Sequence, residues 1–335
     1  MKTNMKRRDL FKSAMGIGAG LASFSVLKPL YAGDNWEVRG PDVPDVPITK
    51  VNERCYYFLA VDPEPSPANY GFFSNPGFVV TSEGVLVVDT GGSVQIGEML
   101  IRQIKTVTDK PVTKIINTHI HGDHWLGNHA FVDAYPDVEI YSHPNVINQV
   151  KAGAGAVWTG FMSRNTNDAT AGTVVTPPTK TLEGSETIQM GDTTIKIHFM
   201  GHVHTDSDLA VEVVEEKTLF IGDMAMRRVA NISDGTFLGT IEAMKQMEAM
   251  DIDVFIPGHG DHEGKDLPRL QREFFEVIYS EIEKYYDEGL SDFEIRPKLD
   301  EHPFMVNEAK NWPGYDTTFG RFVSEAYQEF EANLF

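Results

Sequence analysis

The feature that most constrains this chain is a short segment rich in metal-ligand side chains. Three histidines and one aspartate lie within six residues, as His119, His121, Asp123 and His124. They directly follow residues 114–117, a short apolar run that is typical of a buried strand. Open α/β sheets place their sites at the C-terminal ends of strands. The sequence therefore predicts a site at such a sheet edge.

The spacing within this segment indicates ligands for two metal ions. His119 and His121 are two residues apart in an extended stretch, so their side chains are expected to point the same way. Gly122 lets the chain turn, so Asp123 and His124 can face a second point a few Å away. Neutral imidazole and carboxylate suit zinc, and they also suit iron or manganese.

The pattern His-x-His-x-Asp-His resembles the signature of the metallo-β-lactamase fold superfamily. The resemblance runs from about Thr49 to about Gly264 and implies an α/β fold, a four-layer αββα sandwich with further ligands at other strand ends. The implied metal ligands are His119, His121 and His204 for the first ion, Asp123, His124 and His259 for the second, and a bridging Asp223. The best-known β-lactamase branch has cysteine where this chain has Asp223; thioesterase and lactonase branches carry aspartate there.

Several residues near these ligands have two interpretations. The resemblance makes Asp89 a carboxylate that orients a ligand, whereas position alone also allows the N-cap of a helix expected over residues 94–107. Trp125 either walls the site or packs in the core. Arg227 and Arg228 either hold a substrate carboxylate or phosphate or pair with surface acids, and the sequence leaves this open.

The stretch over residues 151–180 is dominated by small and polar residues and has no clear periodicity. A long, loosely patterned segment in a compact domain is often a binding loop. Trp158, Phe161, Met162 and Arg164 are its candidates for substrate contact. A surface insertion or an oligomer contact fits equally well.

Regular elements are expected along the rest of the chain from periodicity and turn residues. Strands are expected over residues 51–60, 77–81, 84–89, 138–144, 218–223 and 254–260, a hairpin over 187–199, and helices over 94–107, 241–250, 267–289, 291–299 and 320–333.

The charge and the cysteine content exclude some classes of partner. The chain has 29 basic and 49 acidic residues, a net charge of -20, which disfavours nucleic acid and anionic membranes as partners. Its mean hydropathy of -0.25 argues against an integral membrane protein. Cys55 is the only cysteine, so no intrachain disulfide forms, and a buried apolar role is expected for it.

The N-terminus is typical of an export signal. Residues 1–32 carry Arg7 and Arg8 before a mildly apolar run, which resembles a twin-arginine leader and predicts a periplasmic protein. Removal of these residues leaves 23 basic and 48 acidic residues, a charge of 23 − 48 = -25. The expected organisation is a linker over 33–48, the metallo-β-lactamase domain over 49–264 and a helical extension over 265–335 that packs on the domain edge or forms a homodimer contact.

The resemblance implies an exported dinuclear-zinc hydrolase. A hydroxide held by the metals would attack a carbonyl, with Asp123 aligning it, in a β-lactam, lactone or thioester; sulfate and phosphate esters are further candidates. The leader, the ligand pattern and the helical tail resemble periplasmic members associated with quinoprotein and sulfur-oxidation systems. Two other hypotheses are a mononuclear iron persulfide dioxygenase and a non-enzymatic periplasmic maturation factor. The expected partner is a small-molecule substrate.

Overall fold

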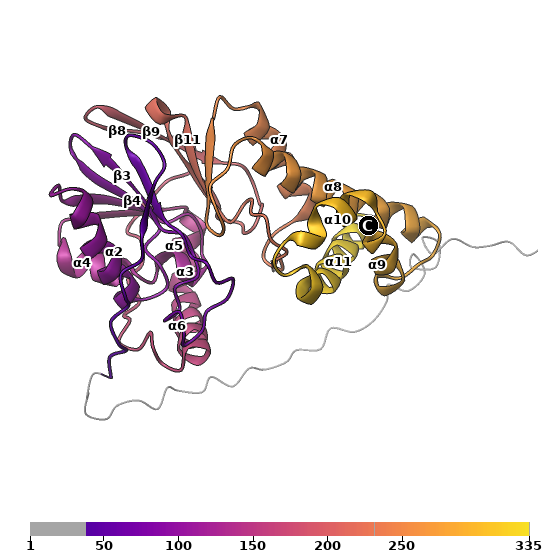
Figure 1. Ribbon diagram of the computed structural model, residues 1–335, viewed down its shortest axis with the longest axis horizontal. Helices are drawn as coiled ribbons and strands as arrows, with labels where there is room; N and C mark the ends of the chain where they lie inside the picture. Colours follow the sequence, from indigo (N-terminus) through magenta and orange to yellow (C-terminus); the bar gives the residue numbers. More distant parts are fainter. Residues whose placement is uncertain (1–37, 231, 335) are drawn as a thin grey trace, which may run out of the picture.

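Two β-sheets lie face to face in the computed structural model, with helices on both outer sides (Figure 1). The structure describes residues 38–230 and 232–334, so the predicted export signal lies outside the described residues. The four-layer α/β sandwich is the fold that the sequence predicted. Among the described residues, none of the helices combines the length and the apolar character that a membrane span requires.

The first sheet has seven strands in chain order, and its last four strands run parallel. The strands are β1 (Ile48–Lys50), β2 (Cys55–Phe58), β3 (Gly77–Thr81), β4 (Gly84–Val88), β5 (Val112–Ile116), β6 (Glu139–Ser142) and β7 (Lys180–Thr181). The second sheet has five strands in the order β12-β11-β10-β9-β8. These are β8 (Thr187–Met190), β9 (Thr193–Phe199), β10 (Leu209–Val213), β11 (Thr218–Gly222) and β12 (Val254–Pro257).

The helices divide into those that cover the sheets and those of the C-terminal extension. The first group is α2 (Val94–Val107), α3 (Gly122–Trp125), α4 (Asn128–Ala134), α5 (Pro144–Lys151), α6 (Ala154–Thr166) and α7 (Phe237–Ala249). The second group is α8 (Asp266–Asp287), α9 (Asp292–Asp300), α10 (Pro303–Asn307) and α11 (Tyr315–Ala332). Short 3₁₀ turns occur at Val214–Glu216 and Ala309–Asn311.

Alternation along β4 shows how the layers form. Val85 and Val87 join the core beneath α2 and α4, whereas Leu86 and Val88 join the core between the two sheets. Successive strand residues point to opposite faces, so a strand that is apolar at every position is buried on both faces. On the other side of the sandwich, Met244 of α7 packs against the second sheet, as its spacing predicted.

Cys55 lies in the core between the sheets, as the sequence predicted. Its side chain is fully buried, and burial raises the pKa of its thiol to about 12. Arg54 points to the opposite side and forms ion pairs with Asp192 and Glu216. The cysteine is therefore a packing residue with no nucleophilic character.

The C-terminal helices, orange to yellow in Figure 1, lie beside α7 and share a hydrophobic core with it. Phe237 and Ile241 of α7 pack there with Phe275 of α8 and Phe322 of α11. The extension is thus joined to the sandwich by a continuous apolar interface.

The strand expected over residues 51–60 is confirmed only over β2 (Cys55–Phe58), because residues 51–54 form a turn. The chain forms β1, turns, and returns as β2 in antiparallel register. The side chain of Asn52 accepts hydrogen bonds from the backbone N–H of Arg54 at 3.3 Å and of Cys55 at 2.9 Å. Such an asparagine turn competes with an extended backbone, and here it breaks the strand.

The long loop expected over residues 151–180 is also wrong in part. Residues Ala154–Thr166 form α6, and only the remainder lacks regular structure apart from the short β7. Helix α6 buries only Gly155, Met162 and Thr166. It therefore has no apolar stripe from which periodicity could have predicted it.

Candidate metal centre

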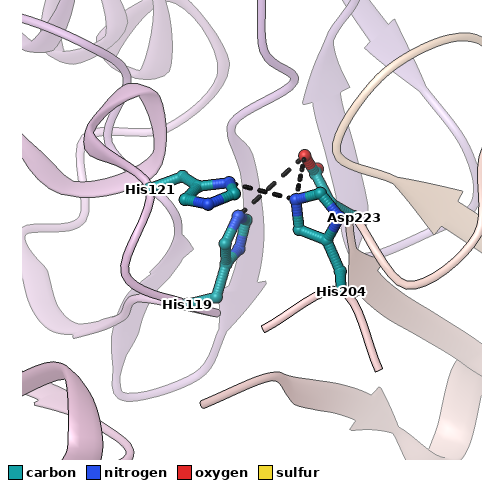
Figure 2. A group of neighbouring side chains, drawn as sticks. All are labelled: His119, His121, His204 and Asp223. Carbon is teal, nitrogen blue, oxygen red and sulfur yellow. Dashed lines mark hydrogen bonds and ion pairs between the residues drawn. The ribbon is translucent and has the colours of Figure 1, made fainter. Parts of the chain in front are cut away.

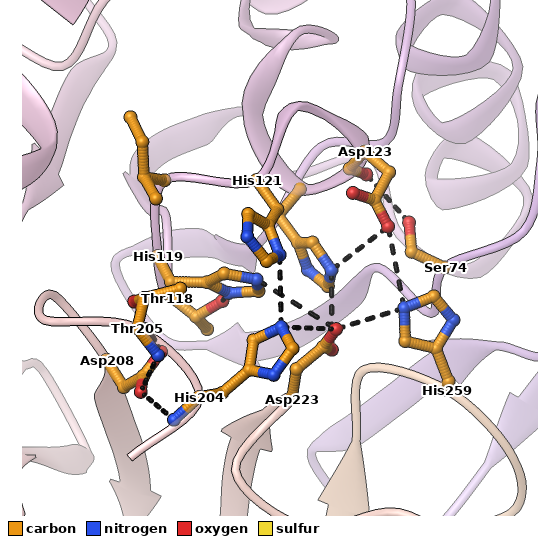
Figure 3. Close-up of polar contacts among 12 residues, drawn as sticks. Ser74, Thr118, His119, His121, Asp123, His204, Thr205, Asp208, Asp223 and His259 are labelled. Carbon is orange, nitrogen blue, oxygen red and sulfur yellow. Dashed lines mark hydrogen bonds and ion pairs between the residues drawn. The ribbon is translucent and has the colours of Figure 1, made fainter. Parts of the chain in front are cut away.

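Strand ends from both sheets meet at one point and bring the seven predicted ligands together (Figure 3). The segment after β5 carries four of them, and the others follow β9, β11 and β12. They form two groups in which the ligand atoms lie within 4.8 Å of one another: His119, His121, His204 and Asp223, and Asp123, His124 and His259. The convergence agrees with the prediction from sequence, although the ligand role of each residue stays a prediction.

The first group points its ring nitrogens at a common centre (Figure 2). Nδ1 of His121 lies 3.0 Å from Nε2 of His204. Oδ2 of Asp223 lies 3.5 Å from Nε2 of His204 and 3.9 Å from Nε2 of His119. Three imidazoles and a carboxylate oxygen at such separations match the ligand types that zinc takes.

The second group is arranged around Asp123, and Asp223 lies between both groups. Oδ2 of Asp123 is 3.2 Å from Nε2 of His124 and 3.5 Å from Nε2 of His259. Oδ1 of Asp223 is 3.4 Å from Nε2 of His124, and its Oδ2 is 3.1 Å from Nε2 of His259. Asp223 therefore lies within reach of both ligand groups.

Asp89 orients His124, which was one of its two predicted roles. Its Oδ2 lies 2.8 Å from Nδ1 of His124, and its carboxylate also accepts hydrogen bonds from the backbone N–H and hydroxyl of Thr118 at 2.8 and 2.9 Å. The N-cap of α2 is Ser93 instead. With Nδ1 donating to a carboxylate, Nε2 of His124 is the ring nitrogen that can offer its lone pair once a metal ion takes the place of its proton.

Two other outer contacts were not predicted from sequence. Nε2 of His121 lies 3.1 Å from Oδ2 of Asp234, so this ring faces the centre through Nδ1. Nδ1 of His259 lies 2.7 Å from the backbone carbonyl of Phe73 and hydrogen-bonds to it. A loop carboxylate in an acidic chain and a backbone carbonyl leave no signal in a single sequence, so neither could have been found there.

Unpartnered buried atoms indicate that a metal fits this centre. Among the described residues, Nε2 of His119, Nε2 of His124 and Oδ1 of Asp223 are buried without a hydrogen-bond partner. An unsatisfied buried polar group is costly, and all three atoms face the same centre. Metal cations bound there would satisfy all three.

The charges of the centre favour the same interpretation. Burial and the neighbouring His121 lower the pKa of His204 to about 3, so this ring is neutral at pH 7. Burial opposes ionisation of Asp223, but His259 and His124 lower the pKa of its carboxyl well below the usual range. Burial also opposes protonation of His124, yet nearby carboxylates raise its pKa well above the usual range. The carboxylates therefore attract positive charge to this point, which a metal ion can supply.

The backbone must approach the centre closely at Gly258. A Cβ atom there would lie 2.1 Å from Oδ1 of Asp223 and 2.8 Å from Cε1 of His124. Such distances force the carboxylate to move. The glycine that precedes His259 is thus needed to leave room for the ligands around it.

The Gly258→Ala variant is expected to displace Asp223, which should weaken zinc binding and lower the free energy of unfolding by about 1–3 kcal/mol, as overpacking does. Zinc competition with a chelator and urea unfolding measure the two effects. Gly264→Ala is the matched control, since the nearest atom to its Cβ lies 3.6 Å away. Zinc affinity equal to that of the unsubstituted protein in both variants would contradict the close approach.

A cavity of about 390 Å³ opens in front of the ligands. Trp158 and Phe161 of α6 line it, and the ring of Trp158 lies 5.0 Å from that of His121. Of the other two candidates in this stretch, Met162 is buried in the core and Arg164 is exposed.

The surroundings of Trp125 and of the two arginines can be compared with the two interpretations that the sequence left open for each. Trp125 is fully buried, and its indole N–H donates to the carbonyl of Ile120, so it packs rather than walls the site. Arg227 pairs with Glu263 at 2.7 Å. Arg228 instead lines the cavity with ligands of both groups, and its side chain is only 15% exposed.

The comparisons with known proteins agree with this architecture. The chain is 24% identical over 296 residues to a linear primary-alkylsulfatase of Pseudomonas sp. (strain ATCC 19151), which covers 74% of this chain and 54% of the relative. The chain thus spans about half the length of that curated relative.

Solved structures and a family profile complete the comparison. A metallo-beta-lactamase from Pontibacter korlensis superposes with a TM-score of 0.55 at 19% identity, covering 69% of this chain and 99% of that one. The stereoselective inverting sec-alkylsulfatase Pisa1 from Pseudomonas sp. has a TM-score of 0.66 at 14% identity, covering 84% and 50%. At these identities the likeness shows the fold.

The profile of the Metallo-beta-lactamase superfamily matches residues 69–259, more than half of the chain. The chain therefore belongs to the metallo-beta-lactamase superfamily.

Proposed function

We propose that the protein is an exported dinuclear-zinc hydrolase that cleaves an ester carrying an anionic group, and that alkyl sulfates are its substrate class. The observation that carries this proposal is the position of Arg228. This largely buried guanidinium lines the cavity that also contains His121, Asp123 and Asp223. A cation beside the ligands can hold an anionic group next to the reacting centre.

Each ligand group has a separate task in this proposal. His119, His121 and His204 would hold one ion, His124, His259 and Asp123 the other, and Asp223 would bridge them. Bound metals of this kind lower the pKa of water and polarise the bond to be broken. Asp123 can accept a hydrogen bond from the attacking water, since its carboxylate lines the cavity. Its backbone carbonyl accepts a hydrogen bond from Ser74, which holds the turn in place.

Two likenesses support a sulfate ester over other anions, and the lining of the cavity supports an alkyl chain on it. The curated relative that covers most of this chain is named an alkylsulfatase. The solved sec-alkylsulfatase covers 84% of the 335 residues, about 281 residues, which exceeds the 264 residues before the C-terminal extension and so includes part of that extension. Phe73, Trp158 and Phe161 give the same cavity an apolar surface that an alkyl chain can cover.

A carbonyl substrate is the second candidate. The observation that favours it is the match to solved metallo-beta-lactamases. This chain covers 99% of each of those two proteins. The sequence predicted such a substrate through its superfamily resemblance. The presence of two separate ligand groups supports two ions over the single ion of an iron dioxygenase.

A substrate panel tests the proposal. Zinc-loaded protein is incubated with an alkyl sulfate, a β-lactam, a lactone and a thioester, and product release is followed. We expect release of inorganic sulfate from the alkyl sulfate, abolished by a chelator and restored by zinc. Cleavage of only the carbonyl substrates would favour the second candidate. Turnover that survives complete metal removal would refute metal-dependent hydrolysis.

Export is a separate part of the proposal. It is supported by Arg7, Arg8 and the apolar run after them. Expression of the full chain and of an Arg7→Lys, Arg8→Lys variant, followed by cell fractionation, tests it. We expect the full chain in the periplasm and the variant in the cytoplasm, while equal periplasmic amounts would contradict a twin-arginine signal.

A further inference from the structure

The C-terminal helix α11 reaches the cavity in front of the metal centre. Thr318 and Arg321 line this cavity together with Arg228 and with the ligands Asp123 and Asp223. Residues 265–335 carry no metal-ligand pattern, and the sequence predicted only an appendage or a dimer contact for them. The position of α11 indicates a direct role at the site.

Helix α11 is fixed to the segment that follows Asp223. The backbone N–H of Val229 donates to the carbonyl of Pro313 at 2.8 Å. The carboxylate of Glu329 accepts hydrogen bonds from the N–H groups of Phe237 and Leu238 at 2.6 and 3.0 Å, at the start of α7. These contacts, with the shared apolar core, hold α11 at a constant distance from the loop that carries Arg228.

The chemistry of Arg321 and Thr318 suits an anion. They are three residues apart on one helix, so they lie on the same face. The guanidinium of Arg321 is paired with Glu325 at 2.9 Å, but its side chain is 61% exposed. Glu325 is only 18% exposed, but ion pairs four residues apart on a helix are weak, so the mostly exposed guanidinium can exchange this carboxylate for an anionic oxygen of a ligand. The Thr318 hydroxyl adds a second donor.

Arg228, in the segment that follows Asp223, provides a second cation at the same cavity. Its guanidinium donates to the carbonyl of Pro63 at 3.1 Å and lies 3.9 Å from the carboxylate of Glu64. The protein carries a net charge of -20, and Asp234 also lines the cavity. An anionic ligand therefore needs local cations in order to enter, and the cavity has one from each of two segments.

We infer that α11 is part of the substrate-binding site, where Arg321 and Thr318 bind the anionic group of the substrate together with Arg228. The inference deepens the proposed function and rests on it for the identity of that substrate. It makes the extension a determinant of specificity. For substrates without an anionic group, KM should not change when Arg321 is substituted.

The first measurement is the binding of inorganic sulfate to the zinc-loaded full chain by titration calorimetry. Arg321→Ala is expected to weaken it about tenfold and Thr318→Val about fivefold, the range for hydrogen bonds with a charged partner. Arg321→Lys should restore part of the affinity, because it keeps the charge and loses the planar fork. The matched control is Arg269→Ala, an exposed arginine of α8 paired with Glu273 at 3.0 Å.

The second measurement separates binding from chemistry. For an alkyl sulfate, Arg321→Ala should raise KM about tenfold and leave kcat nearly unchanged, and KM for a neutral lactone should stay the same. Circular dichroism verifies the fold, and Thr318→Val and Arg321→Lys decide the question if the alanine variant does not fold.

The outcomes distinguish this inference from the proposed function. Sulfate affinity and KM that are the same in Arg321→Ala, Thr318→Val and the unsubstituted protein would overturn the inference, even if alkyl sulfates are hydrolysed. Weaker sulfate binding in these variants, without turnover of any ester, would support the inference and overturn the proposed function. An equal loss of sulfate affinity in Arg269→Ala would show that the effect comes from surface charge in general. That result would also overturn the inference.

Discussion

The Asp223→Asn variant is expected to lose metal and to lower kcat/KM by more than about 100-fold, because removing even a partner of a ligand costs about 10–100-fold. Asp223 lies between the two ligand groups, with His204 at 3.5 Å, His259 at 3.1 Å and His124 at 3.4 Å. Asparagine keeps the shape and removes the charge, so the loss isolates the carboxylate. Burial opposes its ionisation, but His259 and His124 hold its pKa well below the usual range, so the charge is present at neutral pH.

Elemental analysis after gel filtration measures the metal content of this variant, and hydrolysis of the best substrate measures its kcat/KM. Asp251→Asn is the control, since Asp251 is 84% exposed and pairs with Lys217 at the surface. We expect this control to retain full metal content and activity. An Asp223→Asn protein that keeps two metal equivalents would show that the centre does not need a bridging carboxylate.

The convergence of the candidate ligands was predictable in part from a local pattern at a strand end, and His204, Asp223 and His259 were added through the family resemblance. His119, His121, Asp123 and His124 follow a buried strand directly, and His259 follows another. Backbone geometry then brings these ends together: the parallel pairs β4–β5 and β11–β12 end at the same edge, and Leu209 hydrogen-bonds to Thr118 across the two sheets. The sandwich was predicted through the family resemblance of the same segment, and the fully apolar strand β4 agrees with it, since such strands are covered on both faces.

The walls of the cavity were less predictable, because they depend on contacts between distant segments. Trp158 was a candidate, but the helix that carries it has no apolar stripe. Asp234 and Arg321 look like ordinary surface charges in an acidic chain until the fold places them beside His121 and Arg228. Outside the ligand pattern, nothing in the sequence indicated which charged residues of the cavity wall meet.

The Asp89→Asn variant is expected to weaken zinc affinity about 10–100-fold with the fold intact. Asp89 has a left-handed backbone, with φ of 61°, and asparagine is among the few residues that adopt it readily. The substitution therefore leaves the backbone unstrained. It places an amide N–H₂ where the carboxylate now accepts from Thr118 and from Nδ1 of His124. His124 then loses the partner that directs its Nε2 lone pair to the centre.

Chelator competition measures the zinc affinity of this variant, and urea unfolding of the metal-free protein measures its stability. The matched control is Asp192→Asn. The Asp192 carboxylate also accepts hydrogen bonds from a backbone N–H, that of Ser82, and from the side chain of Arg54. None of these three residues is a ligand or a neighbour of one in the sequence. This control should lose stability without losing zinc affinity, because its hydrogen bonds join the turn between β8 and β9 to Ser82 and Arg54 and touch no metal ligand. Equal zinc affinities in Asp89→Asn and in the unsubstituted protein would restrict Asp89 to shaping the backbone at the end of β4. Activity that returns at saturating zinc would instead show that Asp89 acts by orienting His124, because the remaining ligands would still complete the centre once the ion is bound.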